Sequence, residues 1–344
     1  MPPGRQHFVE RGNRNRGADF GWNTLRKDLV SEPICQADHD MDSLWRKERR
    51  TEQPSGAVMN GSDWKPLDQG RWVAKGAAAP ELENRRANPL QRWMIAFTRA
   101  TPLRRGVFRA SISRLVFLLG GNKAFDVGFR DVVFRLEGGR NLIEYGILLN
   151  PTYNAEDIDF LLGGLSDGGV AVDIGCNIGL YSLPLAAATG PNGRCVAIDA
   201  NPLMIERLKR NASLSGLNNV TALASAVSDR DGSGQLTVRK NDDAIVALEE
   251  TGDGPIPVRR LASLLEEASI TRVDVLKIDI EGHEDKALPP FLDSIDRSML
   301  PRRIVIEYPE PGSDYPQCAA AFARHGYHLT GRTRNNSLYR LDDD

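Results

Sequence analysis

Val170-Ala-Val-Asp-Ile-Gly-Cys-Asn-Ile-Gly-Leu180 is the stretch that decides the fold of this chain. Its first half is rich in β-branched residues, which predicts a buried parallel strand with Asp173 near its carboxyl end. Gly175 and Gly179 then permit a tight turn and a close approach of the backbone to a ligand, because neither carries a Cβ atom. The apolar residues from Leu180 onward predict the start of a helix. These features together predict the first half of a nucleotide-binding βαβ unit.

The spacing of the glycines indicates which ligand this turn accepts. A dinucleotide fingerprint is G-x-G-x-x-G, whereas the pattern here is Asp173-x-Gly-x-Asn177-x-Gly. Asn177 stands where a second glycine would be needed, and the Asp173 carboxylate would repel a phosphate and attract an ammonium group. A ligand with an amino acid at one end and a nucleoside at the other fits better, and S-adenosylmethionine is such a ligand.

A second predicted strand, residues 194–199, agrees with this interpretation. It ends in Asp199, which follows Gly179 by about the 20 residues expected for the acid that accepts ribose hydroxyls. Asn201 and Pro202 then predict a helix start, as N-cap and first helical residue. The alternative for Asp199 is an acid that only completes a turn at the end of the strand.

The order of the remaining segments predicts the fold class. Helices and strands alternate from about residue 155 to 325, which favours an α/β fold, a doubly wound, Rossmann-like and mostly parallel sheet. Residues 327–341 predict a C-terminal antiparallel hairpin. A third parallel strand over 220–227 would bring Ser225 and Ala226 toward the adenine. We further expect one strand over 127–136, an edge strand over 233–238, a polar loop over 242–257, and a helix over 287–295 that Pro289 and Pro290 interrupt.

The candidates for chemistry follow a predicted fourth strand, residues 273–279. Ionisable side chains gather there at Asp279, Glu281, His283 and Glu284. In open α/β sheets ligands bind at the carboxyl ends of the strands, so this cluster is the best candidate for a catalytic group. Two further pocket candidates are Tyr153, which could cover the cofactor, and Glu307, which ends a fifth predicted strand.

Composition separates the N-terminal part from the rest. Residues 1–88 are polar with isolated tryptophans, which predicts a disordered extension, or alternatively a small arm that binds a partner. Residues 89–124 form a second segment, in which apolar residues recur at helical spacing and arginines fill other positions, with no acid between Glu83 and Asp126. The part of it over 89–121 could be a basic amphipathic helix in peripheral contact with a membrane, or simply a helix packed on the domain.

The whole composition excludes several classes of protein. The formal net charge is −2, so nothing global points to nucleic acid as a partner. The four cysteines are scattered without a C-x-x-C pair, which argues against a disulfide framework or zinc site and fits a cytoplasmic protein. No apolar run reaches the length of a membrane span, and the N-terminus lacks the pattern of a secretory signal.

Three motifs carry a family resemblance: residues 173–179, Asp199-Ala-Asn-Pro202 and Leu276-Lys-Ile-Asp-Ile-Glu-Gly-His-Glu284. Together they resemble the FkbM family of S-adenosylmethionine-dependent methyltransferases over residues 125–344. The third motif is the most distinctive; the departures are Cys176, where the family often has Ala, and Asp199, where it often has Glu. The resemblance implies that 125–344 is a methyltransferase domain that methylates a hydroxyl of a sugar, a glycan or a polyketide-like natural product.

That chemistry assigns roles to the cluster after the fourth strand. An alcohol is a poor nucleophile, so a base should help by roughly 100- to 10,000-fold. His283 or Glu281 would take the hydroxyl proton while Asp279 positions cofactor or substrate. Alternatively His283 only caps the next helix, or Asp279, Glu281 and Glu307 hold a divalent ion. The predicted cofactor-binding residues are Asp173, Gly175, Asn177, Gly179, Asp199, Ser225, Ala226 and Asp279, with no metal ligand assigned.

Two other functions stay open on the sequence. A protein of this fold could be a non-catalytic adaptor that retains cofactor binding and uses its basic helix to hold a membrane or an acidic partner. It could also methylate protein or nucleic acid, against which stand the near-neutral charge and the absence of an Asn/Asp-Pro-Pro-Tyr signature after the fourth strand. The expected partner is therefore a small-molecule or glycan acceptor.

Overall fold

The computed structural model describes residues 64–67, 71–74, 85–104, 108–138, 141–238, 246–249, 254–310 and 313–342. The predicted extension, residues 1–88, lies outside the described residues except for 85–88 and one backbone hairpin, in which β1 (Trp64–Leu67) pairs antiparallel with β2 (Arg71–Ala74). In the described ranges no helix combines the length and apolar composition needed to cross a membrane.

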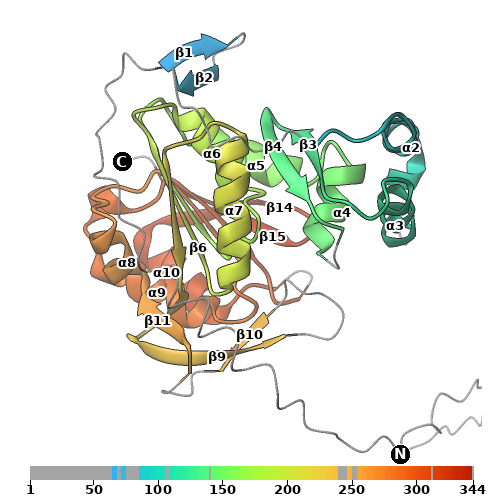
Figure 1. Cartoon of the computed structure of the whole chain (residues 1–344). Coiled ribbons are helices and arrows are strands. Elements are labelled where there is room, and N and C mark those ends of the chain that lie inside the picture. The colour runs from blue at the N-terminus through green and yellow to red at the C-terminus, as the bar shows by residue number, and fades with distance from the viewer. Residues whose placement is uncertain are drawn as a thin grey trace, which may run out of the picture. The chain divides into compact units, whose positions relative to one another are not determined.

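A seven-stranded sheet forms the centre of the fold (Figure 1). Its order is β14 (Tyr327–Arg332), β15 (Asn336–Leu341), β13 (Arg303–Glu307), β12 (Val275–Ile278), β5 (Val170–Ile174), β6 (Arg194–Asp199) and β7 (Val220–Ala224). Neighbouring strands are parallel from β13 to β7, and β15 is antiparallel to both β13 and β14. The predicted mostly parallel Rossmann-like sheet and its C-terminal hairpin are confirmed.

The strand order also fixes where a ligand can enter. From β5 the chain moves outward through β6 and β7, and it then returns to place β12 on the other side of β5, with Ile278 opposite Ile174. The loops after β5 and β12 therefore leave the sheet toward opposite faces and open a crevice between them.

Helices cover both faces of the sheet, as the alternation of its side chains requires. Val172, Val196 and Leu276 pack with α8 (Leu261–Glu267), α9 (Glu284–Ser294) and α10 (Pro316–His325). Ala171, Cys195 and Val275 face the opposite layer, which contains α5 (Ala155–Leu162), α6 (Ser182–Thr189) and α7 (Pro202–Leu214). Because side chains alternate along a strand, each strand of this parallel sheet is apolar on both faces.

An additional layer precedes β5. It comprises α2 (Pro89–Ala100), the short 3-10 turn η3 (Pro102–Arg104), α3 (Arg109–Leu119), the hairpin of β3 (Phe125–Phe129) and β4 (Val132–Leu136), and α4 (Leu142–Leu149). The segment 89–121 is therefore two helices, with Pro102 just after the first. The expected single strand 127–136 is a hairpin, because Arg130 and Asp131 both adopt positive φ and reverse the chain.

Three other expectations are corrected beyond β7. The strand over 220–227 divides at Ser225, and its second part, β8 (Ala226–Ser228), joins a four-stranded sheet of order β10-β9-β11-β8. The predicted edge strand, β9 (Gly232–Val238), lies inside that sheet, between β10 (Val246–Glu249) and β11 (Ile256–Arg260). Strand β10 and the start of β11 come from the expected polar loop over 242–257, and the alternating burial of Ile256 and Val258 supports a strand there.

Helix α9 continues through Pro289 and Pro290, contrary to the predicted interruption. Both prolines remove a backbone donor, and an interior proline normally breaks a helix. Here Leu288, Phe291 and Leu292 are buried in the core beneath the helix, so packing outweighs the local penalty.

Candidate functional site

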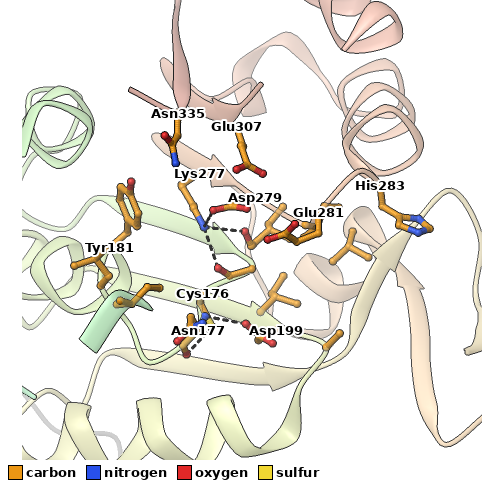
Figure 2. A pocket seen from close by; sticks show the side chains of 18 of the residues that line it. Cys176, Asn177, Tyr181, Asp199, Lys277, Asp279, Glu281, His283, Glu307 and Asn335 are labelled. Carbon is orange, nitrogen blue, oxygen red and sulfur yellow. Dashed lines mark hydrogen bonds and ion pairs between the residues drawn. The ribbon is translucent and has the colours of Figure 1, made fainter. Parts of the chain in front are cut away.

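A pocket opens at the carboxyl ends of β5, β6 and β12, where the strand order predicts it (Figure 2). Eight of the predicted site residues line it, and two do not. The lining residues are Gly175, Asn177, Asp199, Ser225, Ala226, Asp279, Glu281 and His283. Asp173 and Gly179 lie behind the lining, and the two further candidates, Tyr153 and Glu307, line the pocket.

Asp173 is fully buried beneath the pocket. One carboxylate oxygen accepts hydrogen bonds from the backbone N–H and the hydroxyl of Ser182, the first residue of α6, at 3.0 and 2.5 Å. The other oxygen is 3.6 Å from the ammonium of Lys277. Burial raises the pKa of Asp173, and Lys277 opposes that rise. In this arrangement Asp173 fixes the start of α6 and the position of Lys277.

Lys277 was not among the predicted site residues, although a single lysine within an apolar strand is a visible signal. Its ammonium donates to the carbonyl of Gly175 at 2.9 Å and lies 3.6 Å from both Asp173 and Asp279. It also lies 5.2 Å from the ring centroid of Tyr181. Burial lowers the pKa of Lys277, but the carboxylates of Asp279 and Asp173 outweigh that effect and raise the pKa above its ordinary value. The charged Lys277 of β12 therefore links the end of its own strand to the turn that follows β5.

The turn after β5 needs its first glycine because another strand end contacts it. Gly175 has a φ of +74°, and a Cβ atom at this position would lie 1.8 Å from the carbonyl oxygen of Asp279. Asn177 follows with a φ of +48°, and its side-chain oxygen accepts from the amide of Asn141 at 2.8 Å. The turn is thereby fixed from two sides, and its backbone forms one wall of the pocket.

Asp199 is held by the same turn. Its carboxylate accepts the backbone N–H groups of Asn177 and Asn201, both at 2.8 Å. Asn201 also caps α7, as predicted, by accepting from the N–H of Leu203. Burial raises the pKa of Asp199 to about 6, although the two N–H donors act in the opposite direction. The carboxylate is therefore oriented and mostly ionised at neutral pH.

Carboxyl groups concentrate on the other side of the pocket. Asp279, Glu284 and Glu307 each place an oxygen within 4.8 Å of the others. Burial and then the charges of Asp279 and Glu281 raise the pKa of Glu307 to about 9. Glu284 is already engaged, because it accepts the N–H groups of Ile280 and Gly282 at 2.7 and 2.9 Å. The structure thus groups Glu284, rather than the expected Glu281, with Asp279 and Glu307.

The turn that follows β12 separates the remaining two candidates. Glu281 and Gly282 have φ values of +55° and +102°, so the chain reverses sharply between Asp279 and His283. In Figure 2 Glu281 points toward Asp279, whereas the ring of His283 lies apart from that group. His283 occupies the N-cap position of α9, but its side chain makes no capping hydrogen bond.

A buried polar network closes the pocket near α5. Asp157 accepts hydrogen bonds from Tyr181, Thr333 and Asn336 at 3.1, 2.7 and 2.8 Å. Asn154 occupies the N-cap position of α5, but its side chain donates to the Tyr181 hydroxyl at 2.7 Å and makes no capping hydrogen bond. Burial raises the pKa of Asp157, and its three donors oppose that rise. Sequence reasoning missed this network, because its members are up to 179 positions apart.

Comparison with known proteins identifies the domain around this pocket. Residues 173–329 match the model of the methyltransferase FkbM domain. Methyltransferase sdnD of Sordaria araneosa is 28% identical over an alignment of 203 residues, and the match covers 49% of this chain and 77% of the relative. Methyltransferase 1 of Beauveria bassiana is 24% identical over an alignment of 184 residues, and the match covers 47% of this chain and 73% of the relative.

Among solved structures, Trm5b from Pyrococcus abyssi has a TM-score of 0.37 and 15% identity, covering 64% of this chain and 55% of that chain. The strand order and the family match carry the assignment. The motif residues Asp173, Asp199 and Lys277 to Glu284 all lie within the matched range. The chain thus carries a methyltransferase FkbM domain over residues 173–329, and it is an S-adenosylmethionine-dependent methyltransferase.

Proposed function

We propose that the pocket holds S-adenosylmethionine and that the enzyme methylates a hydroxyl oxygen of a small-molecule or glycan acceptor, such as a sugar or a polyketide-like compound. One observation carries this proposal. Asp199, which is oriented by two backbone N–H groups, and Asp279, which is paired with Lys277, face one pocket from its two sides. An acid for the ribose and an acid near the reacting oxygen are what such a transfer needs.

The residues of the pocket fit this cofactor. Asp199 would accept the ribose hydroxyls, and Ser225, Ala226 and Val227 would border the adenine. The backbone from Gly175 to Asn177 would hold the amino-acid end. Asp173 would act indirectly, because its oxygens are committed to Ser182 and Lys277. When bound, the cofactor supplies a methyl group that its sulfonium already activates, so the protein has mainly to align donor and acceptor.

Asp279 is the base we favour for the acceptor proton. It lines the pocket, and Lys277 keeps a positive charge 3.6 Å from it. Glu307 has a raised pKa and is protonated at neutral pH. The pair of Asp279 and Glu307 therefore holds one proton, which can shift between the two carboxyl groups as the acceptor hydroxyl loses its own proton. His283 is the weaker candidate, since its ring lies apart from this group.

Two measurements test the proposal. Calorimetry with S-adenosylmethionine should give a saturable signal for the parent, weakened roughly tenfold or more in Asp199→Ala, since a charged hydrogen bond is worth about 1.5–3 kcal/mol. No heat with saturating donor would refute the cofactor assignment. Transfer of labelled methyl to glycan and lipid extracts, with the labelled position determined by mass spectrometry, should then identify the acceptor atom.

The same transfer assay separates the two bases. Asp279→Asn should lose roughly 100-fold or more in rate at saturating donor, whereas His283→Ala should stay within about threefold of the parent. The opposite ranking would return the role to His283. Adding EDTA distinguishes the divalent-ion alternative, since loss of activity that a divalent ion restores would favour the metal.

A further inference from the structure

The exposed apolar side chains of this protein are concentrated in one segment. Of ten exposed large apolar residues in the described ranges, seven fall between positions 90 and 118. On α2 they are Leu90, Trp93 and Phe97, which are 52%, 60% and 48% exposed. These residues recur at i, i+3 and i+7, so they form one stripe along the helix. The rings of Trp93 and Phe97 stack with their centroids 5.6 Å apart.

Helix α3 and its N-cap residue Phe108 carry a second stripe of the same kind. Phe108, Leu115 and Leu118 are 61%, 42% and 62% exposed, and they recur at i, i+7 and i+10. Val116 and Phe117 of the same helix are buried in the core, so the exposed stripe is a separate face.

Helices α2 and α3 lie at the outer end of the additional layer that precedes β5, and buried contacts hold them in place. They pack on each other and on α4, beyond the β3–β4 hairpin as seen in Figure 1. Arg99 of α2 donates to the carbonyls of Ile147 and Leu148, both at 3.0 Å, and Gln91 donates to the carbonyl of Val116. The stripes are therefore held by buried contacts on the opposite faces of their helices.

The charge around the stripes has one sign. Residues 85–125 contain nine Arg and Lys residues and no Asp or Glu. Arg92, Arg114 and Lys123 are exposed on or beside the two helices. A separate cavity between the start of α2 and the end of α3 is lined by Arg85, Arg86 and Lys123 among others, and no acid lines it. A ligand for this surface should carry negative charge beside apolar groups.

We propose that the α2–α3 surface, defined by Leu90, Trp93, Phe97, Phe108, Leu115 and Leu118 with the surrounding Arg and Lys residues, docks on the face of an anionic lipid bilayer. The stripes would enter the boundary between headgroups and acyl chains, and the basic residues would meet the lipid phosphates. Neither helix would cross the membrane. A second copy is a poor occupant, because two faces without a single acid repel each other. A nucleic acid would leave the aliphatic residues without apolar contact.

Flotation of the full-length protein with vesicles tests this proposal. It should float with phosphatidylcholine vesicles that contain about one third phosphatidylglycerol, much less with phosphatidylcholine alone, and less at high salt. Trp93→Glu combined with Phe97→Glu should weaken partitioning at least about tenfold. Leu329→Glu is the matched control, since Leu329 is 40% exposed on β14, and it should float like the parent. Circular dichroism and S-adenosylmethionine binding check that each variant is folded.

A second variant keeps the test decisive should the first not fold. Arg92→Ser combined with Arg114→Ser removes two exposed charges and should reduce partitioning about tenfold. The proposal is overturned by absence of flotation with anionic vesicles or by flotation that neither pair of changes weakens. It is also overturned by a dimer in light scattering that the Trp93→Glu and Phe97→Glu changes abolish. Cofactor binding is measured separately, so its failure leaves this test interpretable.

Discussion

Asp199 makes the proposed cofactor contact dependent on pH. Its pKa is raised to about 6, so the carboxylate is ionised at pH 7.5 and largely protonated at pH 5.5. A protonated acid accepts hydroxyl protons less well, and we expect the dissociation constant for S-adenosylmethionine to increase about threefold between these values. Calorimetry at both pH values measures it. Asp199→Asn should bind more weakly and lose this pH dependence; a persisting dependence would place the titrating group elsewhere.

Glu307 makes the stability of the protein dependent on pH. Its pKa is raised from an ordinary value of 4.5 to about 9, so the folded protein holds a proton that the unfolded chain releases. Stability from this group is present below about pH 4.5 and is lost as pH rises toward 9. Glu307→Gln cannot ionise. Its melting temperature should equal the parent's near pH 4 and exceed it by about 3 °C or more at pH 8. A constant difference across this range would contradict the assignment.

The turn between β5 and α6 is the element that the fold depends on most directly. Gly175 and Gly121 both have positive φ values, +74° and +67°. Only Gly175 is crowded, because a Cβ atom added there would lie 1.8 Å from the Asp279 carbonyl oxygen, whereas one added at Gly121 would meet no atom within 4 Å. Gly121→Ala should therefore cost about 1 kcal/mol for its backbone alone. Gly175→Ala should cost about 3 kcal/mol or more and abolish cofactor binding. Urea unfolding compares them, and equal losses would refute the close approach of β12.

At the same scale, the sequence predicted best those elements whose local signal agrees with their packing. The bounds of β6 match the prediction, β5 lies in the predicted stretch, and β13 ends at Glu307 as predicted, because parallel strands buried on both faces are continuous apolar runs between turn residues. The hairpin turn at Arg130-Asp131 was missed, since neither residue is a usual signal for two positive φ values. At Pro289 and Pro290 the local signal predicted a helix break that does not occur, because the buried neighbours of the two prolines keep α9 helical.

The site was predictable to the extent that it depends on strand ends. Asp199 and Glu307 end their strands and Asp279 directly follows its own, so the topology of the sheet places all three at one edge. The contacts of Asp173 could not be predicted from the sequence, because its partners Ser182 and Lys277 are fixed by the tertiary packing of α6 and β12. A single sequence records residue types near a strand end but not which of them face the pocket.

At the scale of the whole molecule, Asp157 joins three separate parts of the chain. It lies on α5 and binds Tyr181 just before α6, Thr333 and Asn336 in the C-terminal hairpin. Tyr181 and Asn336 also line the pocket, so the closing hairpin supports the site that the first βαβ unit creates. Because the acid is buried, its removal would leave the buried donors of Tyr181 and Asn336 without their acceptor in the interior.

We therefore expect Asp157→Ala to lower the free energy of unfolding by about 3 kcal/mol and to weaken cofactor binding. Asp159→Ala is the matched control on the same helix, since the Asp159 side chain is 63% exposed and pairs with Arg130 at 2.6 Å. An exposed pair of this kind contributes at most about 1 kcal/mol. Urea unfolding and calorimetry of both variants decide the matter. If the two lose equal stability, the hairpin is held by its strand pairing with β13, and Asp157 does not connect it to the pocket.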